Sequence, residues 1–441
     1  MNYLKLKRKD ILGERKALKN VRGTKDILPE DSFKWQHIET KVRGIFDLYN
    51  YKEIRTPIFE ETELFARGIG ELTDIVSKEM YTFKDKGGTK LTLKPEMTAS
   101  VMRAYIQYEI NKKVPLFKVY YISPMFRQER PQAGRLRQFH QIGAEAIGSV
   151  NPEVDAEIIS LTLHIIDSFG VKNYLLKINS VGCQKCRPKY KVVLRDYLKN
   201  FYDSLSEESK KRFEYNPLRI LDSKDESDRK IVQNAPKILN YLCNECDAHF
   251  KELLAYLNGL GISYEVDARL VRGLDYYTKT AFEVLSKELG SQDAIAGGGR
   301  YDMLSSLIGG PDIPGVGFAL GMERLLIILE KNNYNFGQDK KNLIFIASVG
   351  SRAKLHSLKI AQELRKKSIP CEIDLLNRSL KSQMKEANRQ GARYVVIIGE
   401  SEIEKDVCLV RDMNSGEQVE VPFGKIVEYI VDKYAKEITK N

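Results

Sequence analysis

The sequence predicts two folded regions of different class: an α+β domain built on an antiparallel sheet with a helical insertion, and a C-terminal α/β domain with a mixed sheet. In the first region, strand-like and helical stretches alternate without the regular spacing of βαβ units. A stretch at 183–250, rich in Lys, Arg, Glu and Ser, carries a helical pattern and interrupts them. After a polar segment without periodicity, continuous apolar strands alternate with helices, which is typical of a sheet covered on both faces.

The predicted domain boundaries lie where the residue pattern changes. Residues 1–20 form a basic, partly helical leader, 21–331 the first domain, 332–342 a polar linker and 343–441 the C-terminal domain. The expected elements of the first domain are a helix at 31–49, strands at 80–84, 90–94 and 117–123, a turn at Gly87–Gly88, a helix at 95–110, renewed strands over 262–300 and a closing helix at 317–331. Those of the C-terminal domain are strands at 343–349, 370–375 and 394–398 and helices at 352–367 and 379–390.

The composition limits the kind of partner and the cellular compartment that we expect for the chain. Lys and Arg number 71 and Asp and Glu 60 among 441 residues, for a net charge of +11. A net charge of this size is expected for a protein with a polyanionic partner, either a nucleic acid or a phosphorylated substrate. It is equally expected for a protein whose positive charge is spread over a large surface. No apolar run approaches the ~20 residues of a membrane span, and the basic N-terminus lacks the apolar region of a secretory signal. Because six cysteines are too few for a disulfide scaffold, we expect a cytoplasmic protein.

The densest cluster of charge is the arginine-rich segment FRQERPQAGRLRQFHQIGAEAIG at 126–148. The sequence has no P-loop and no GxGxxG after a strand, so a nucleotide has to be held by other residues. Arg127, Arg130, Arg135 and Arg137 crowd around the loop PQAG between two apolar runs, and arginine suits bidentate binding of phosphate. Phe139 adds a flat apolar face of the kind an adenine needs. The alternative is a basic surface hairpin.

Two further segments combine glycines with polar side chains. LVRGLDYYTKTAFEV at 270–284 places Arg272 beside adjacent tyrosines, Tyr276 and Tyr277. In a strand these two rings point to opposite faces, so one packs in the core while the other donates its hydroxyl to a ligand; the alternative is two structural tyrosines. AIAGGGRYD at 294–302 has three consecutive glycines, which a strand tolerates where a backbone or a ligand approaches closely.

The last two segments each place a charge at a helix start. In GVGFALGMERLL at 315–326, Glu323 and Arg324 open an apolar helix. An arginine there opposes the helix dipole at a cost of a few tenths of a kcal/mol, which is more easily explained if it meets an anion. In LTLKPEMT at 91–98, Glu96 either caps a helix or binds a ligand ammonium.

These segments resemble the signature motifs of class II aminoacyl-tRNA synthetases, and specifically of bacterial-type histidyl-tRNA synthetases. FRQERPQAGRLRQFHQ resembles motif 2, and GVGFALGMERL resembles motif 3. RGTKDILP at 22–29 resembles the family's start, and LVRGLDYY and AGGGRYD resemble its two histidine-specific motifs. Residues 344–441 resemble the anticodon-binding domain shared with glycyl, threonyl and prolyl enzymes. The resemblance implies the class II synthetase fold and a homodimer formed through motif 1, around residues 43–60.

The resemblance also implies roles for individual residues. Arg127 matches the arginine on the α-phosphate of ATP and Arg324 the arginine on the γ-phosphate, while Phe139 matches the ring that stacks on adenine. Arg272 matches the histidine-specific arginine at the reacting carboxylate and α-phosphate, so Arg272 and Arg127 are the expected catalytic residues. The remaining matches are Glu129 and Arg135 near the nucleotide, Glu96, Thr98 and Gln141 around the ammonium group, Glu145 and Tyr277 at the imidazole, and Tyr276 and Tyr301 nearby.

The implied reaction is the ATP-dependent attachment of L-histidine to tRNA(His) through a histidyl-adenylate, with release of AMP and diphosphate. ATP is expected with Mg²⁺. A non-catalytic alternative is a regulatory subunit of the phosphoribosyltransferase that begins histidine biosynthesis, which typically lacks the anticodon domain and degrades the arginine motif. This chain has Arg272 and residues 344–441. Another synthetase of the same subclass is a further alternative, and RGLDYY and GGGRYD argue against it.

The cysteines form two CxxC pairs. Cys183 and Cys186 open the predicted insertion, and Cys243 and Cys246 close it. Four such thiols could make a structural zinc site, although the stretch between the pairs is far longer than in a compact zinc ribbon. The alternative is free thiols. Cys371 and Cys408 are expected to be ordinary core residues.

Overall fold

The structure, a computed structural model, describes residues 17–70, 73–132, 134–290, 294–337 and 343–438. The chain forms two compact units that divide between Phe336 and Gly337. Most of the predicted leader, residues 1–16, and part of the predicted linker, 338–342, lie outside the described residues. Within the described ranges, no helix is both long enough and apolar enough to cross a membrane.

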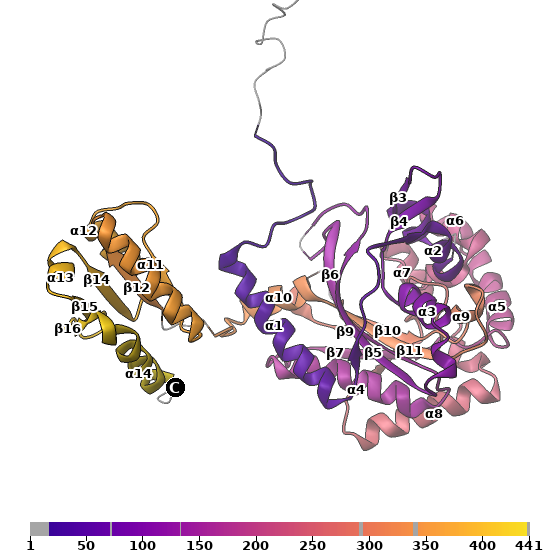
Figure 1. The fold of residues 1–441 in the computed structure, drawn as a ribbon. Coiled ribbons are helices and arrows are strands. Elements are labelled where there is room, and N and C mark those ends of the chain that lie inside the picture. The colour runs from indigo at the N-terminus through magenta and orange to yellow at the C-terminus, as the bar shows by residue number, and fades with distance from the viewer. Residues whose placement is uncertain (1–16, 71–72, 133, 291–293, 338–342, 439–441) are drawn as a thin grey trace, which may run out of the picture. The chain divides into compact units, whose positions relative to one another are not determined.

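The larger unit is built on an eight-stranded sheet of order β1-β5-β6-β11-β10-β9-β7-β8 (Figure 1). Its strands are β1 (Lys52–Glu53), β5 (Phe117–Phe126), β6 (Gln138–Ile147), β7 (Leu175–Ser180), β8 (Glu265–Val266), β9 (Thr278–Leu285), β10 (Ala294–Arg300) and β11 (Gly315–Gly321). Neighbouring strands among the six inner ones are antiparallel, and the two-residue edge strands β1 and β8 run parallel to their neighbours. The predicted antiparallel α+β sheet is confirmed.

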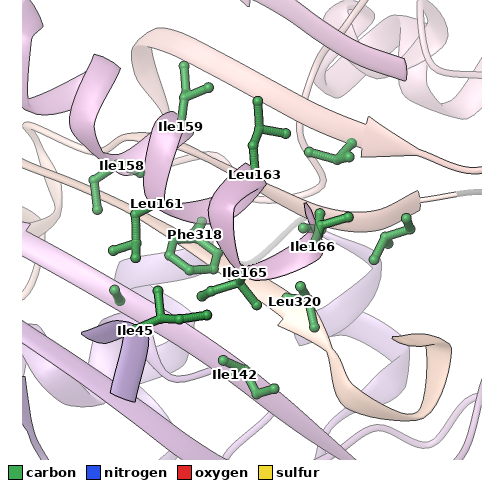
Figure 2. Packing of buried hydrophobic residues seen from close by; sticks show 14 of the residues in the cluster. Ile45, Ile142, Ile158, Ile159, Leu161, Leu163, Ile165, Ile166, Phe318 and Leu320 are labelled. Carbon is green, nitrogen blue, oxygen red and sulfur yellow. The ribbon is translucent and has the colours of Figure 1, made fainter. Parts of the chain in front are cut away.

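Long helices close one face of this sheet. They are α1 (Pro29–Leu48), α4 (Pro152–Ser168), α8 (Asn244–Gly259) and α10 (Met322–Lys331). The buried core lies between them and the strands, and Figure 2 shows Ile165 and Ile166 of α4 over Phe318 and Leu320 of β11. Because α4 carries apolar residues on several sides, it can contact the sheet and its neighbouring helices together. This packing leaves the opposite face of the sheet for a site.

The opposite face carries shorter elements. They are α2 (Thr62–Ile69), α3 (Thr98–Gln107), α9 (Leu304–Leu307) and a small sheet of order β2-β4-β3, with β2 (Phe59–Glu61), β4 (Lys90–Leu93) and β3 (Tyr81–Lys84); the short helices η1 (Ile75–Glu79), η2 (Ile110–Lys112) and η6 (Lys287–Leu289) lie in connecting segments. The β3–β4 pair turns at Gly87–Gly88, as predicted. Side chains alternate across β6, so Ala144 and Ala146 face the helical core and Glu145 faces this side.

The predicted insertion is helical. It contains α5 (Arg187–Lys199), α6 (Glu207–Tyr215) and α7 (Glu226–Val232), with the short helices η3 (Tyr202–Ser204), η4 (Pro217–Ile220) and η5 (Ile238–Tyr241) between them. These elements share an apolar cluster of their own, which includes Tyr190, Leu194 and Ile220. In contrast, α8 packs into the core of the main sheet through Leu253 and Leu257.

The expected closing helix at 317–331 is wrong at its start. Gly315–Gly321 is strand β11, and α10 begins at Met322. The glycines of this stretch suit a central strand because its neighbours approach closely: a Cβ added at Gly317 would overlap the Glu145 carboxylate of β6. The glycines therefore make room for a buried side chain of the adjacent strand, and the helix starts only after them.

The smaller unit has a five-stranded sheet of order β13-β12-β14-β15-β16. Its elements are β12 (Ile344–Ser348), α11 (Ser351–Lys366), β13 (Cys371–Ile373), α12 (Leu380–Arg389), β14 (Tyr394–Ile398), α13 (Glu400–Glu404), β15 (Val407–Asp412), β16 (Gln418–Pro422), η7 (Phe423–Lys425) and α14 (Ile426–Ile438). β13, β12 and β14 are parallel and the other two strands antiparallel, so the predicted mixed sheet is confirmed. Apolar clusters form on both faces, and Cys371 and Cys408 are buried as predicted.

Candidate active site

A cavity of about 400 Å³ lies on the open face of the main sheet. The segments that line it include the β4–α3 connection, the arginine-rich hairpin between β5 and β6, residues 272–277, the start of β10, Tyr301 after β10, and the β11–α10 junction. These segments bring the following predicted residues together on the cavity wall: Glu96, Thr98, Arg127, Glu129, Arg135, Phe139, Gln141, Arg272, Tyr276, Tyr277, Tyr301 and Arg324. Glu145 is the exception, because it lies behind the wall.

The arginine-rich hairpin places Arg127 above the ring of Phe139. β5 and β6 pair up to Phe126 and Gln138, and the Arg127 backbone N–H donates to the carbonyl of Arg137 at 2.9 Å. The Arg127 guanidinium lies 5.2 Å from the Phe139 ring centroid, and its Nε donates to the carbonyl of Pro95 at 3.0 Å. This geometry joins a fixed cation to an apolar ring on one wall.

The Glu129 carboxylate forms ion pairs with two arginines of the hairpin. It lies 2.9 Å from Nε of Arg135 and 3.8 Å from Nη1 of Arg127. One carboxylate between two guanidiniums leaves a net positive charge at this end of the cavity. Such a charge with several N–H donors suits a polyphosphate.

Arg324 adds a third guanidinium from the first turn of α10. Its Nε donates to the carbonyl of Gly134 at 3.1 Å and its Nη1 to the carbonyl of Ala294 at 2.5 Å, so it bridges the hairpin and β10. Burial and the nearby charge of Arg135 lower the pKa of Arg324 from its ordinary value. Its surroundings therefore oppose its charge, and a bound anion would reverse that effect.

Arg272 reaches the cavity from the loop before β9. It forms an ion pair with Glu283 of β9, and its guanidinium lies 5.8 Å from the Tyr277 ring centroid. Gly297 of β10 gives it room, because a Cβ there would lie 2.6 Å from Nη1. The close backbone approach predicted for the glycine run is found at Gly298, where a Cβ would overlap the carbonyl oxygen of Gly317. Among the side chains that the structure describes, Nε of Arg272 has no hydrogen-bond partner, which leaves a donor for a ligand.

A network of hydroxyl groups surrounds the Glu145 carboxylate. The hydroxyls of Tyr301, Thr98 and Tyr121 donate to it at 2.6, 2.8 and 3.3 Å. Glu145 is 1% exposed, and burial raises its pKa to about 8, although the hydroxyl donors act in the opposite direction. These groups form a polar floor beneath the cavity that can discriminate among small polar side chains.

Glu96 caps helix α3. Its carboxylate accepts hydrogen bonds from the backbone N–H groups of Thr98 at 2.7 Å and Ala99 at 2.9 Å. The Tyr276 hydroxyl also donates to it at 3.4 Å. The capping alternative is therefore realised in this structure, and the same carboxylate still lies on the cavity wall.

The expectation that Tyr276 and Tyr277 point to opposite faces is wrong. Strand β9 begins only at Thr278, and the preceding residues form a turn, so the alternation of an extended strand does not apply to them. The two rings are 4.9 Å apart between centroids, and both line the cavity. Both tyrosines are thus available to the site.

Four polar residues of the cavity wall were not predicted from the sequence. Glu283 and Tyr121 lie on β9 and β5, and the signal for Glu283 was an acid between the apolar residues of a strand. Asp222 and Lys224 come from the insertion, where nothing local distinguishes them from other charged residues. The insertion is fixed here because Nη1 of Arg219 donates to the carbonyl of Gly273 at 2.8 Å.

Comparison with known proteins agrees with this geometry. A family model described as histidyl-tRNA synthetase matches residues 23–325, and one described as anticodon binding domain matches residues 343–433. The chain is 53% identical to the histidine–tRNA ligase of Halothermothrix orenii over 411 residues, 93% of this chain and 98% of that protein. It is 50% identical to the histidine–tRNA ligase of Clostridium perfringens over 406 residues, 92% of this chain and 97% of that protein.

A solved structure is similar over the same extent. The apo histidyl-tRNA synthetase of S. aureus superposes with a TM-score of 0.77 at 41% sequence identity, covering 93% of this chain and 99% of that one. The family match spans the whole cavity, including the hairpin and the 270–277 segment. With a family model over most of its length and relatives at about half identity, this chain belongs to the histidyl-tRNA synthetase family.

Proposed function

We propose that this chain is an ATP-dependent histidine–tRNA ligase that forms a histidyl-adenylate and transfers the histidyl group to tRNA(His). The observation that carries the proposal is the convergence of three arginines on one cavity. Arg272, from the segment specific to the histidine enzymes, faces the same space as Arg127 and Arg324, from the motifs common to the class. An amino acid carboxylate and a triphosphate can therefore meet there.

In this proposal ATP occupies the cationic end of the cavity. Arg127 binds the α-phosphate, Arg324 binds the γ-phosphate, and adenine stacks on Phe139. Glu129 and Arg135 lie beside the nucleotide. The carboxylates of Glu129 and Glu283 on the cavity wall supply the oxygen ligands that Mg²⁺ prefers, and the ion would neutralise part of the triphosphate charge when bound.

Histidine occupies the polar end. We assign Glu96, Thr98 and Gln141 to its ammonium group and Glu145 and Tyr277 to its imidazole, with Tyr276 and Tyr301 beside them. Glu145, behind the cavity wall, acts through the hydroxyls of Tyr301, Thr98 and Tyr121. Oε1 of Gln141 is buried without a hydrogen-bond partner among the described residues, which supports a ligand donor at this point. A side chain that cannot hydrogen-bond would leave the polar groups of the cavity wall that face it without a partner, so binding selects a polar ring.

The chemistry follows from bringing two anions together. A carboxylate oxygen of histidine attacks the α-phosphorus, the bond to the bridging oxygen breaks, and diphosphate leaves. This step needs no general base because the carboxylate is ionised at neutral pH. Arg272 and Arg127 align the reactants and offset the charge on the α-phosphate. In the second step the terminal ribose hydroxyl of the tRNA attacks the carbonyl carbon, and AMP leaves.

The remaining assignments concern organisation and partners. We assign residues 21–331 as the catalytic domain, 332–342 as the linker and 343–441 as the anticodon-binding domain; the family match over 343–433 supports the last of these. We further propose a cytoplasmic homodimer that associates through residues 43–60. Light scattering during size-exclusion chromatography tests the dimer, for which a monomeric mass would be contradictory.

The test of the proposed function is ATP–pyrophosphate exchange by the full chain with each amino acid in turn, followed by charging of tRNA. We expect exchange with histidine alone and transfer to tRNA(His). Exchange with a different amino acid would assign the chain to another specificity. The absence of exchange with every amino acid would favour a non-catalytic role.

A further inference from the structure

Four cysteines outside the cavity converge at the base of the helical insertion. Cys183 and Cys186 lie in the turn between β7 and α5, and Cys243 and Cys246 lie at the start of α8. Their four sulfur atoms all lie within 4.8 Å of one another. Two chain segments that are far apart in sequence thus present one compact group of thiols.

The spacing of the sulfur atoms fits the ligands of a single metal ion. Sγ of Cys183 lies 3.7 Å from Sγ of Cys186 and 3.8 Å from Sγ of Cys243. Four thiolates at a Zn–S distance of about 2.3 Å in a tetrahedron are about 3.8 Å apart. A disulfide needs about 2.05 Å, so these distances describe a ligand set and not a bonded pair.

The surroundings of the thiols also suit bound metal. The backbone N–H of Cys243 donates to Sγ of Cys186 at 3.1 Å, and that of Lys185 donates to Sγ of Cys183 at 3.3 Å. Such N–H···S bonds orient thiolate ligands and offset their charge. Cys186 and Cys246 are buried whereas Cys183 and Cys243 are half-buried, which leaves a route for the ion.

The cluster is connected to the cavity through its neighbours in sequence. Arg187 follows Cys186, and its guanidinium donates to the carbonyl of Val181 at 3.0 Å and to the carbonyl of Tyr277. The segment before Cys183 pairs with Lys279, whose N–H donates to the carbonyl of Gly182 at 2.9 Å. The group of thiols therefore sits where the insertion, strand β9 and a cavity tyrosine meet.

We propose that Cys183, Cys186, Cys243 and Cys246 bind one structural Zn²⁺ that joins the two ends of the insertion. The ion cross-links the turn before α5 to the start of α8. It thereby holds the insertion, including Asp222 and Lys224, against the catalytic sheet and fixes Arg187 on Tyr277. The site has four protein ligands and is closed, as structural zinc sites are, so it takes no part in the chemistry itself.

Metal analysis of the full chain tests this proposal. The protein is expressed with zinc in the medium, and metals are measured by mass spectrometry in the wild type, in Cys183→Ser, in Cys243→Ser and in the control Cys371→Ser. Cys371 is buried in the other unit, and its Sγ donates to the carbonyl of Ala361 at 3.4 Å, a contact that serine can keep. We expect about one zinc per chain in the wild type and the control, and loss of most of it in the two cluster variants.

A second measurement does not depend on how the variants fold. The wild type, stripped by a chelator and reloaded with Co²⁺, should show the visible absorption of a tetrahedral thiolate site, and the stripped protein should melt at a lower temperature than the loaded one. A wild type without bound metal, with iron in place of zinc, or with a disulfide in this group would overturn the proposal. Zinc retained in full by both cluster variants would also overturn it. None of these results depends on which amino acid the enzyme activates.

Discussion

The buried carboxylate of Glu145 should make the stability of the catalytic unit depend on pH. Burial raises its pKa to about 8, whereas a glutamate in the unfolded chain has a pKa of about 4.3. At a pH between these two pKa values, the folded state therefore holds a proton on Glu145 that the unfolded state has lost. The associated stability is fully present below about pH 4 and is lost as pH rises through the folded-state pKa of about 8. The difference amounts to about 5 kcal/mol at 1.36 kcal/mol per pKa unit.

Glu145→Gln removes this titration while keeping the shape of the side chain. Urea unfolding of both proteins is followed by the fluorescence of Trp35, the sole tryptophan, which packs against the core of the larger unit and so reports on that unit. Titrations at other sites cancel in the difference between the two proteins. Between about pH 5 and about pH 9, the stability of the variant relative to the wild type should rise by several kcal/mol.

The matched control is Glu226→Gln on the insertion, where the side chain is 86% exposed. Its difference from the wild type should stay nearly constant over the same range of pH. A Glu145→Gln difference that is equally constant would refute the reasoning, because it would mean that Glu145 has a similar pKa in the folded and unfolded states.

Three other changes test the buried ion pair, the adenine site and the charged surface. Asp155→Ala leaves Arg300 buried without its main partner and should destabilise the larger unit by about 3–5 kcal/mol, whereas Asp247→Ala, at a half-exposed pair with Lys251, should cost under about 1 kcal/mol; urea unfolding compares them. Phe139→Ala should raise the KM for ATP about fivefold or more, since stacking of a base on a ring contributes about 1–3 kcal/mol, and an unchanged KM would contradict the stacking role. Added salt should weaken tRNA binding steeply but change the KM for ATP little, because tRNA releases counterions from a large surface whereas the arginines proposed to bind ATP lie in a cavity; equal salt dependence in binding and exchange assays would count against this division.

Much of the fold was predictable because hydrophobic periodicity is a local property. Strands 80–84, 90–94 and 394–398 and the helix at 31–49 lie within a few residues of their predicted bounds. The start of the 317–331 helix was not predictable in this way, because the apolar residues of the strand at 315–321 run directly into those of the helix. The glycines of that strand make room for the Glu145 carboxylate on the neighbouring strand, a contact that no local pattern contains.

Some residues of the candidate site could likewise be predicted from the sequence, and others could not. Arg127 and Arg324 could be named because one lies in a dense arginine cluster and the other at a helix start, and because both match the family motifs. Asp222 and Lys224 could not, because they reach the cavity only through the folding of the insertion. The Tyr276–Tyr277 pair shows a third case: both residues line the cavity, but their predicted directions were wrong because a turn precedes β9.

The central claim is that Arg272 brings the histidine carboxylate and the α-phosphate together. The most direct measurement is histidine-dependent ATP–pyrophosphate exchange by Arg272→Ala beside Arg269→Ala, whose half-exposed side chain pairs with Asp267 outside the cavity. We expect Arg269→Ala to exchange like the wild type. Arg272→Ala should lose exchange while its Trp35 unfolding curve shows an intact fold. Near-normal exchange by a folded Arg272→Ala protein would contradict the account.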